Sequence, residues 1–124
     1  MIIGVGVDLV SIDRIEKIYE KYPDQFLKRI FSDTEKGNFA GKGSPMAGLA
    51  ARFAAKEAVL KAIGCGIGPA ALNEVEIITL PGRQPRAILH GEALRLADEK
   101  NIKDIAVSIS HEPPLACAFA IAFS

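Results

Sequence analysis

The sequence lacks any hydrophobic run long enough to span a bilayer, although 49% of its 124 residues are hydrophobic. A transmembrane helix needs about 20 consecutive, mainly apolar residues. The apolar stretch at residues 1–10 has no basic flank and no cleavage signal, so it does not resemble a secretory signal peptide. We therefore expect no membrane association.

An excess of charge of either sign is also missing. Lys and Arg total 15, and so do Asp and Glu. Proteins that bind nucleic acids in general carry a basic surface, so we expect no nucleic-acid partner.

Cysteine is scarce: Cys65 and Cys117 are far apart, and neither has neighbours at metal-site spacing. Cys117 lies in an apolar segment, where a buried free thiol is expected. Free thiols suit a reducing compartment, which predicts a cytoplasmic protein.

Internal repeats and low-complexity segments are absent too, and the hydrophobic pattern that is present predicts one compact α+β domain over residues 1–124. The predicted strands are Ile2–Val10, Val75–Leu80, Ala87–Leu89, Ile105–Ile109 and Leu115–Phe123. The predicted helices run from Ser11 to Pro23, around Phe26–Phe31, from the capping box Ser32–Glu35, from about Pro45 to Ile63, and up to about Asn101. In the first helix, Ile12, Ile15, Ile18 and Tyr22 are expected to face inward.

The segment Leu115–Phe123 is apolar on both faces, because large side chains alternate with alanines at 116, 118, 120 and 122. One face can pack on helices. The alanine face then needs a second cover, either another helix or another subunit. Its small side chains would allow a neighbouring sheet to approach closely.

Two carboxylates stand in otherwise apolar surroundings. Glu57 falls on the stripe of the long helix that carries Phe53 and Leu60, and Lys61 is one turn further along. An internal ion pair is the ordinary interpretation of such a carboxylate. Asp8 interrupts the first strand near its end, where a helix-capping role is the ordinary interpretation. Together the two carboxylates indicate a site for a hard cation such as Mg²⁺.

Three motifs carry a family resemblance. Gly6-Val7-Asp8 followed by Arg14 resembles the G-[IV]-D-x5-R signature of the 4'-phosphopantetheinyl transferases, and within them the short bacterial holo-acyl-carrier-protein synthases. Phe53-x-x-Lys56-Glu57-Ala58-x-x-Lys61 resembles the second signature, and Ser108-Ile109-Ser110-His111 the third. The order, the spacing and the chain length all match.

The resemblance implies a fold in which an antiparallel-rich sheet packs against a long helix, and a transfer of the 4'-phosphopantetheine arm of coenzyme A to a serine of an apo acyl-carrier protein. Adenosine 3',5'-bisphosphate would be released. Asp8 and Glu57 would hold Mg²⁺, and Lys61 would contact the phosphates. The acceptor serine needs a base, for which Glu57, Asp33 through a water, and a metal-bound hydroxide all stay open.

The resemblance also implies residues for the coenzyme and an oligomer. His111 would reach the 3'-phosphate from the adjacent subunit of a homotrimer, and the predicted coenzyme-binding residues are Arg52, Lys61, Gly64, Ser110 and His111. Gly64 begins a glycine-rich loop that is not a P-loop, because no GK[ST] follows it.

An acidic carrier protein would need a basic docking surface, for which the sequence offers Arg14, Lys17, Lys21 and Lys28. Ordinary solvated charges explain such a stripe equally well. Lys36-Gly37-Asn38 departs from the family pattern of a continued helix, and glycine there costs helix stability.

Two other functions stay open at this point. One is a coenzyme A or nucleotide-binding oligomer without transfer activity, and the other is an Mg²⁺-dependent phosphohydrolase that uses water in place of serine.

Overall fold

The computed structural model describes residues 1–39, 46–65, 70–79 and 82–124. Its strands are β1 (Ile2–Ser11), β2 (Val75–Ile78), β3 (Arg86–Leu89), β4 (Asp104–Glu112) and β5 (Leu115–Phe123). Its helices are α1 (Ile12–Lys21), α2 (Pro23–Ile30), α3 (Asp33–Phe39), α4 (Met46–Ile63) and α5 (Gly91–Glu99), with one 3₁₀ turn, η1 (Leu72–Glu74). The predicted α+β class is confirmed.

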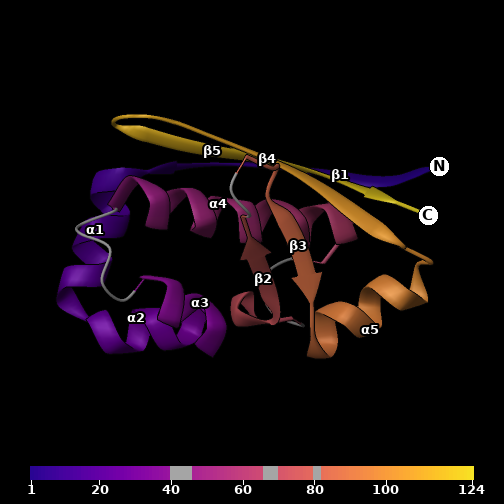
Figure 1. The fold of residues 1–124 in the computed structure, drawn as a ribbon, viewed down its shortest axis with the longest axis horizontal. Coiled ribbons are helices and arrows are strands. Elements are labelled where there is room, and N and C mark those ends of the chain that lie inside the picture. Colours follow the sequence, from indigo (N-terminus) through magenta and orange to yellow (C-terminus); the bar gives the residue numbers. More distant parts are fainter. Residues whose placement is uncertain (40–45, 66–69, 80–81) are drawn as a thin grey trace.

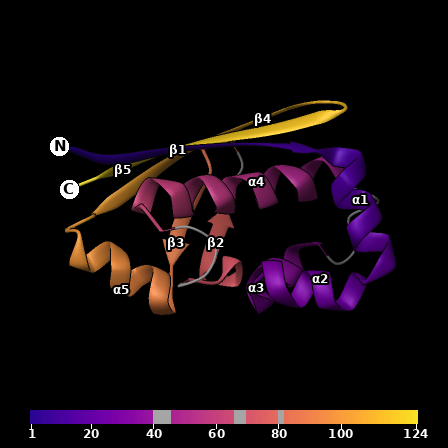
Figure 2. The ribbon, with the colours of Figure 1, turned by 180° about the vertical axis from the view of Figure 1, so that it is seen from behind.

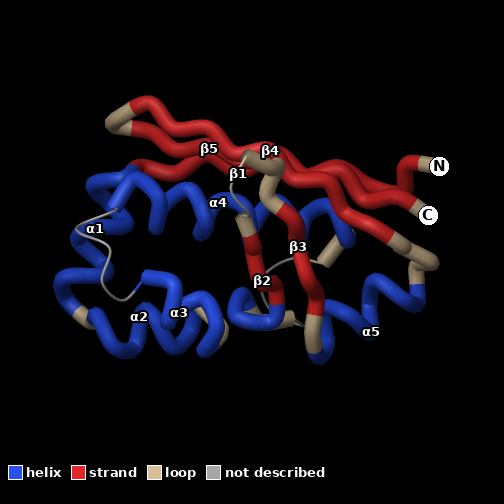
Figure 3. The backbone as a smooth tube through the Cα atoms, viewed as in Figure 1, coloured by secondary structure: helices blue, strands red, loops and turns tan. Residues whose placement is uncertain are grey.

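The strands form one antiparallel sheet in the order β1-β5-β4-β3-β2 (Figure 3). β1, β5 and β4 pair along most of their length, whereas β3 meets β4 through the single pair Arg86 and Ala106. The two termini therefore lie side by side at one end of the sheet (Figure 1).

Helix α4 lies directly against the sheet, with the smaller helices and the β2–β3 hairpin on its other side (Figures 1 and 2). Two glycines of β1 permit this close approach. A Cβ atom on Gly4 would collide with the carbonyl oxygen of Ala62, and one on Gly6 would collide with that of Ala58. The helix backbone thus rests on the strand backbone, which places the side chains of α4 beside the edge of β1.

The alanine face of β5 is covered by this helix. Ala116, Ala118, Ala120 and Ala122 are all buried, and α4 packs against both β1 and β5. Of the two covers predicted for this face, another helix or another subunit, the structure shows the helix, so the expected approach of a neighbouring sheet to the alanines is wrong. The opposite face of the sheet stays open instead, and it exposes large apolar side chains of β1 and β5, namely Ile3, Val5, Val7, Leu9, Leu115 and Phe119.

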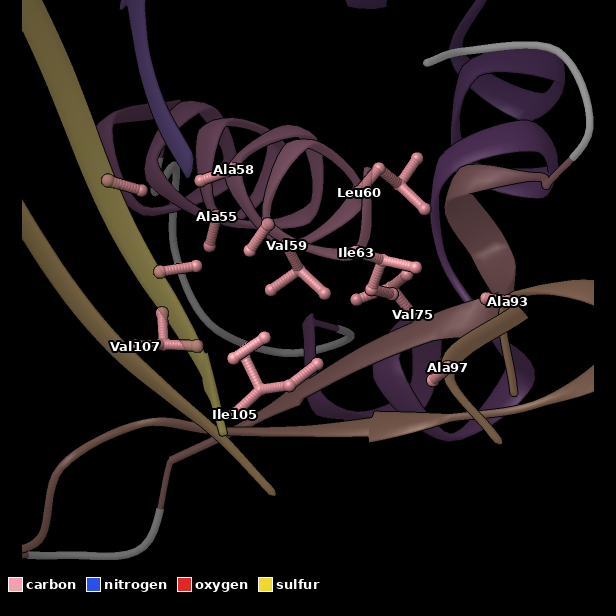
Figure 4. Packing of buried hydrophobic residues seen from close by; sticks show 14 of the residues in the cluster. Ala55, Ala58, Val59, Leu60, Ile63, Val75, Ala93, Ala97, Ile105 and Val107 are labelled. Atoms are coloured by element: carbon pink, nitrogen blue, oxygen red, sulfur yellow. The ribbon is translucent and has the colours of Figure 1, made fainter. Parts of the chain in front are cut away.

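The main hydrophobic core fills the space between α4, the sheet and α5. Figure 4 shows Val59 and Ile63 of α4 between Val107 and Ile105 of the sheet and Val75 of β2. A second cluster joins α1 and α2 to the first half of α4, through residues such as Ile15, Phe26 and Leu49. Nearly every side of α4 is consequently buried.

Several local predictions are confirmed. Ser11 caps α1, with its hydroxyl accepting from the N–H of Arg14 at 3.3 Å. Ser32 and Glu35 form a reciprocal capping box, in which Ser32 Oγ accepts from the Glu35 N–H and Glu35 Oε1 from the Ser32 N–H. Gly64 has φ +88° and ends α4 as predicted.

Other local predictions need correction. Ile18 and Tyr22 are 41% and 52% exposed, so the inner face of α1 is shorter than expected. Cys117 is only half-buried, because it points to the open face of the sheet. The helix α3 includes Lys36-Gly37-Asn38 and continues to Phe39, and the effect of this departure on carrier docking stays a prediction. Pro45, Leu80 and the loop after Cys65 lie outside the described residues.

Among the described residues, no helix combines the length and hydrophobicity that crossing a membrane requires.

Candidate active site

Strand alternation turns Asp8 toward α4. Gly4, Gly6 and Asp8 share the inner face of β1, while Val5 and Val7 point outward. The Asp8 side chain is only 16% exposed. Its Oδ2 atom is buried and has no hydrogen-bond partner among the described residues. A buried carboxylate oxygen normally has a binding partner. The position of this oxygen therefore indicates that it binds a group from outside the protein chain, such as a cation.

Lys61 reaches Asp8 from α4. Its Nζ lies 3.2 Å from Asp8 Oδ1 and donates a 3.0 Å hydrogen bond to the carbonyl oxygen of Val7. The Lys61 side chain is 51% exposed. The ammonium group therefore lies at the surface where α4 meets β1. There it can bind an anion from solvent and keep its contact with Asp8.

Glu57 stands one helical turn before Lys61 and is half-buried. Burial raises the pKa of its carboxyl group, and the negative charge of Asp8 raises it further, while Lys61 opposes the shift. The fold thus keeps the carboxylates of Asp8 and Glu57 near each other at the edge of β1, although their charges repel. The residue spacing along α4 and the alternation of side chains along β1 together produce this acidic pair.

The acidic pair fits a magnesium ion. The described residues contain no cluster of three or more His, Cys, Asp or Glu side chains that would enclose a metal. Mg²⁺ does not need one, because it commonly binds one or two carboxylates together with waters and substrate phosphates. The unpartnered Oδ2 of Asp8 offers one ligand atom, and Glu57 offers the second.

Sequence reasoning missed a buried ion pair beside the site. Lys56 and Glu35 are 0% and 1% exposed, and Lys56 Nζ lies 2.6 Å from Glu35 Oε1. The sequence indicates Glu35 as part of a cap and Lys56 as part of a motif, and neither pattern points to the other residue. The signal that could have found the pair is that Phe53, Val59 and Leu60, which lie one turn before and after Lys56 on α4, are all apolar.

The predicted coenzyme-binding residues do not lie together at one place within the chain. Arg52 is on the side of α4 that faces β2, where its Nη1 donates to the carbonyl oxygen of Ile77 at 3.4 Å. Gly64 is at the far end of α4, next to Lys100, whose Nζ donates to the Ile63 carbonyl oxygen at 2.6 Å. Lys61, one of the five predicted residues, contacts Asp8.

Ser110 and His111 are exposed at the end of β4. Ser110 pairs with Cys117 and His111 with Ala116, so their side chains point to opposite faces of the sheet. β5 lies between β4 and β1. At about 4.8 Å per strand, His111 is roughly 10 Å or more from Asp8 in the same chain.

The predicted docking residues Arg14, Lys17, Lys21 and Lys28 are all exposed on α1 and α2. Beside them lies a groove of about 220 Å³, lined by Ile18, Tyr22, Gln25, Phe26, Arg29, Ile30 and Phe53. Phe53, which lines the groove, is one turn before Glu57 on α4. Asp33 is fully exposed at the start of α3 and pairs with Lys36 at 3.1 Å.

A second groove, of about 600 Å³, lies between the β2–β3 hairpin and β4, and Arg83 and Arg86 are among its lining residues. None of the predicted site residues lines it.

Comparison with known proteins adds a family to this geometry. The model of the 4'-phosphopantetheinyl transferase superfamily matches residues 4–120. A holo-[acyl-carrier-protein] synthase from Natranaerobius thermophilus is 44% identical over 124 residues, which is 100% of this chain and 99% of the relative.

The chain belongs to the 4'-phosphopantetheinyl transferase superfamily. Within this superfamily it is an enzyme of the holo-[acyl-carrier-protein] synthase group.

Solved structures agree with this assignment. The crystal structure of holo-[acyl-carrier-protein] synthase from Neisseria meningitidis has a TM-score of 0.91 and 34% identity, with 100% of both chains covered. The Helicobacter pylori holo-[acyl-carrier-protein] synthase, solved in complex with coenzyme A, has a TM-score of 0.82 and 32% identity, covering 96% of this chain and 99% of that one. At these identities the transferases share the fold of this chain.

Proposed function

We propose that this transferase moves the 4'-phosphopantetheine arm of coenzyme A onto a serine of an apo acyl-carrier protein, in an Mg²⁺-dependent reaction that releases adenosine 3',5'-bisphosphate. The observation that carries the proposal is the acidic pair Asp8 and Glu57. Asp8 has a buried oxygen without a hydrogen-bond partner among the described residues, and Lys61 contacts Asp8 at the surface. The reaction is inferred from the family, and these residues are the groups of this chain that would carry it out.

Phosphoryl transfer depends mainly on positioning and on charge neutralisation. A divalent cation held by Asp8 and Glu57 would stabilise charge on the pyrophosphate oxygens of coenzyme A. Lys61, half-exposed at the same edge, would donate to a phosphate oxygen as a point charge. Because Asp8 is already turned inward and anchored by Lys61, little reorganisation is needed when the coenzyme binds.

The acceptor serine must lose a proton. Between the two candidate carboxylates, the geometry favours Glu57, since Asp33 is fully exposed and already paired with Lys36.

The carrier protein would dock on α1 and α2. Lys17 and Lys21 offer positive charge to an acidic helix, and the exposed Ile18 and Tyr22 offer an apolar contact between them. Since the groove runs to Phe53, a helix seated there would bring its serine toward Glu57. This explains why Ile18 and Tyr22 are exposed although they follow the spacing of a buried face.

The working form is a homotrimer with active sites between subunits. Val5, Val7, Leu9 and Phe119 are 55%, 53%, 61% and 42% exposed on the open face of the sheet, which is more apolar than a solvated surface normally is. Within one chain His111 stays away from Asp8 across β5. A second copy on the open face would supply both the missing cover and the histidine. The number three comes from the family resemblance.

We place this enzyme in the cytoplasm, as one domain over residues 1–124. The family model covers residues 4–120, and both cysteines are free.

The mass of the carrier protein tests the proposal. We expect apo acyl-carrier protein, incubated with coenzyme A, Mg²⁺ and this enzyme, to gain the mass of one phosphopantetheine arm, and the gain to disappear when EDTA removes the metal. Release of nucleotide without a gain in carrier mass would identify a phosphohydrolase. Binding of coenzyme A without turnover would identify an inactive binding protein.

A further inference from the structure

The buried pair Lys56 and Glu35 has contacts that its role as an ion pair does not require. Lys56 Nζ donates to Glu35 Oε1 at 2.6 Å, to the carbonyl oxygen of Leu72 at 3.3 Å and to that of Val75. It also lies 5.1 Å from the centre of the Phe31 ring. One side chain of α4 therefore joins α3, η1 and β2.

Glu35 completes the junction. Its Oε2 accepts the N–H of Ile77 in β2 at 3.1 Å, and its Oε1 accepts the N–H of Ser32 at 3.1 Å. β2 is an edge strand of the sheet, and such edges leave backbone groups without strand partners. Glu35 and Lys56 satisfy some of those groups, so the fold pairs both charges completely even though both are buried.

The apolar residues of α4 do not mark one inner face. Buried alanines, Leu49, Val59, Leu60 and Ile63 surround the helix on nearly all sides, so its hydrophobic pattern alone does not set its rotation. Specific contacts help to set the rotation. On one side Gly4 and Gly6 of β1 meet Ala62 and Ala58, and on the other side Lys56 meets Glu35.

Glu57 lies between these two anchors. Successive helix residues are about 100° apart, so Glu57 points to the side of α4 that lies between the directions of Lys56 and Ala58, where the charge of Asp8 acts on it. A rotation of α4 by a fraction of that angle would carry the carboxylate away from Asp8. Metal-binding carboxylates tolerate such displacement poorly, because their geometry is usually maintained by supporting contacts.

We propose that Lys56 and Glu35 are positioning residues which fix the rotation of α4, and thereby hold Glu57 against Asp8 in the geometry that binds the divalent cation. The inference rests on the proposed function, in which Asp8 and Glu57 hold that cation. It assigns Lys56 no contact with the coenzyme and no step in the chemistry.

The direct test is cation affinity, measured with Mn²⁺ by electron paramagnetic resonance in the presence of coenzyme A. Lys56→Met keeps the length and apolar stem of the side chain but removes its charge. We expect it to weaken Mn²⁺ binding by about 10- to 100-fold, the effect usual for a residue that supports a metal ligand. We expect the Mg²⁺ concentration for half-maximal transfer to rise by a similar factor.

Val59→Ala is the matched control, because Val59 is a fully buried residue of the same helix that takes no part in the ion pair. We expect it to lower the melting temperature without weakening Mn²⁺ binding. If Lys56→Met does not fold, the pair of changes Glu35→Gln and Lys56→Met leaves no buried charge and retains an acceptor for the Ile77 N–H, and the same measurement applies to it.

The outcomes separate the two levels of inference. Wild-type Mn²⁺ affinity in folded Lys56→Met overturns the positioning role, and so does an equal loss in Val59→Ala, which would show a general effect of stability. Glu57→Gln tests the proposed function beneath it. If Glu57→Gln binds Mn²⁺ as the wild type does, the cation site itself is wrong, whatever Lys56→Met shows.

Discussion

At the scale of single residues, the Glu57 carboxylate is half-buried, and its pKa is raised first by burial and then by the charge of Asp8. A carboxyl group with a raised pKa binds its proton more tightly in the folded state, so its ionisation costs folding free energy. In the absence of metal we therefore expect Glu57→Gln to have a higher melting temperature than the wild type at neutral pH. In the presence of Mg²⁺ we expect the same variant to be inactive in transfer.

The pH dependence follows from the same sign. Stability from protonated Glu57 is complete below the unfolded pKa of about 4.5 and is lost as pH rises through the higher folded value. The difference in melting temperature between Glu57→Gln and the wild type should thus become smaller as the pH is lowered toward 4. Thermal melts in EDTA at several pH values measure it, and a wild type more stable than Glu57→Gln at neutral pH would contradict the assignment.

Lys61 is expected to serve the reaction more than the fold. Its ion pair with Asp8 is half-exposed, and such pairs contribute about 0–1 kcal/mol to stability. A charge directed at a phosphate in a partly desolvated site contributes more. We expect Lys61→Ala to lower kcat/KM by roughly 100-fold or more and to move the melting temperature only slightly. Unchanged kinetics with a large loss of stability would make Lys61 a structural residue.

The sequence indicated Asp8 and Glu57 because carboxylates in apolar segments are conspicuous, and two of the three family motifs contain Asp8, Glu57 and Lys61. It did not indicate Lys56 and Glu35. Their partners are backbone groups of Leu72, Val75 and Ile77, and tertiary packing alone decides which edge of a sheet meets which helix. The sequence likewise did not show that the predicted coenzyme-binding residues lie apart from one another within one chain.

At the scale of elements, the alternation of large and small residues in β5 was visible in the sequence, but the covered face was assigned incorrectly. Alanines pack against α4 because the helix backbone approaches the sheet at Gly4 and Gly6, and this contact depends on residues far away in the chain. Element types were predictable from period and capping, whereas the choice between two apolar faces was not.

Neighbouring residues of β5 give a matched test of the two faces. Ala120 is fully buried under α4, and Phe119 is 42% exposed on the open face. We expect Ala120→Glu to prevent folding, because it buries an unpaired charge. Phe119→Glu should give a folded subunit that no longer assembles. Circular dichroism and analytical ultracentrifugation report the two effects, and a Phe119→Glu variant that assembles normally would show that the open face is not the interface.

Helix α1 carries the expected contact with the carrier protein. Reversing its charge with Lys17→Glu and Lys21→Glu should raise the KM for the carrier protein by about 10-fold or more, since charge complementarity guides such encounters. The KM for coenzyme A should not change, because both residues lie on the outer surface of α1. Steady-state kinetics with each substrate varied in turn decide this. Equal effects on both KM values would place the contact elsewhere.

At the scale of the whole molecule, the proposed site is divided between copies. One chain presents Asp8, Glu57 and Lys61 at the edge of β1, and His111 at the end of β4 on the other side of β5. Glu57→Ala and His111→Ala should each be inactive, and mixing them under subunit exchange should restore part of the activity. Some interfaces would then join an intact acidic pair to an intact histidine. Mixtures that exchange subunits without any recovery would contradict a shared site.

A crystal structure with coenzyme A and Mn²⁺ tests the central claim most directly, because the anomalous signal of manganese locates the cation without assumptions. We expect one peak within coordination distance of Asp8 Oδ2 and a Glu57 carboxylate oxygen, with the pyrophosphate of the coenzyme on its open side and His111 of a second subunit near the 3'-phosphate. A manganese peak away from both carboxylates, with coenzyme A bound, would show that the acidic pair is not the centre of the transferase.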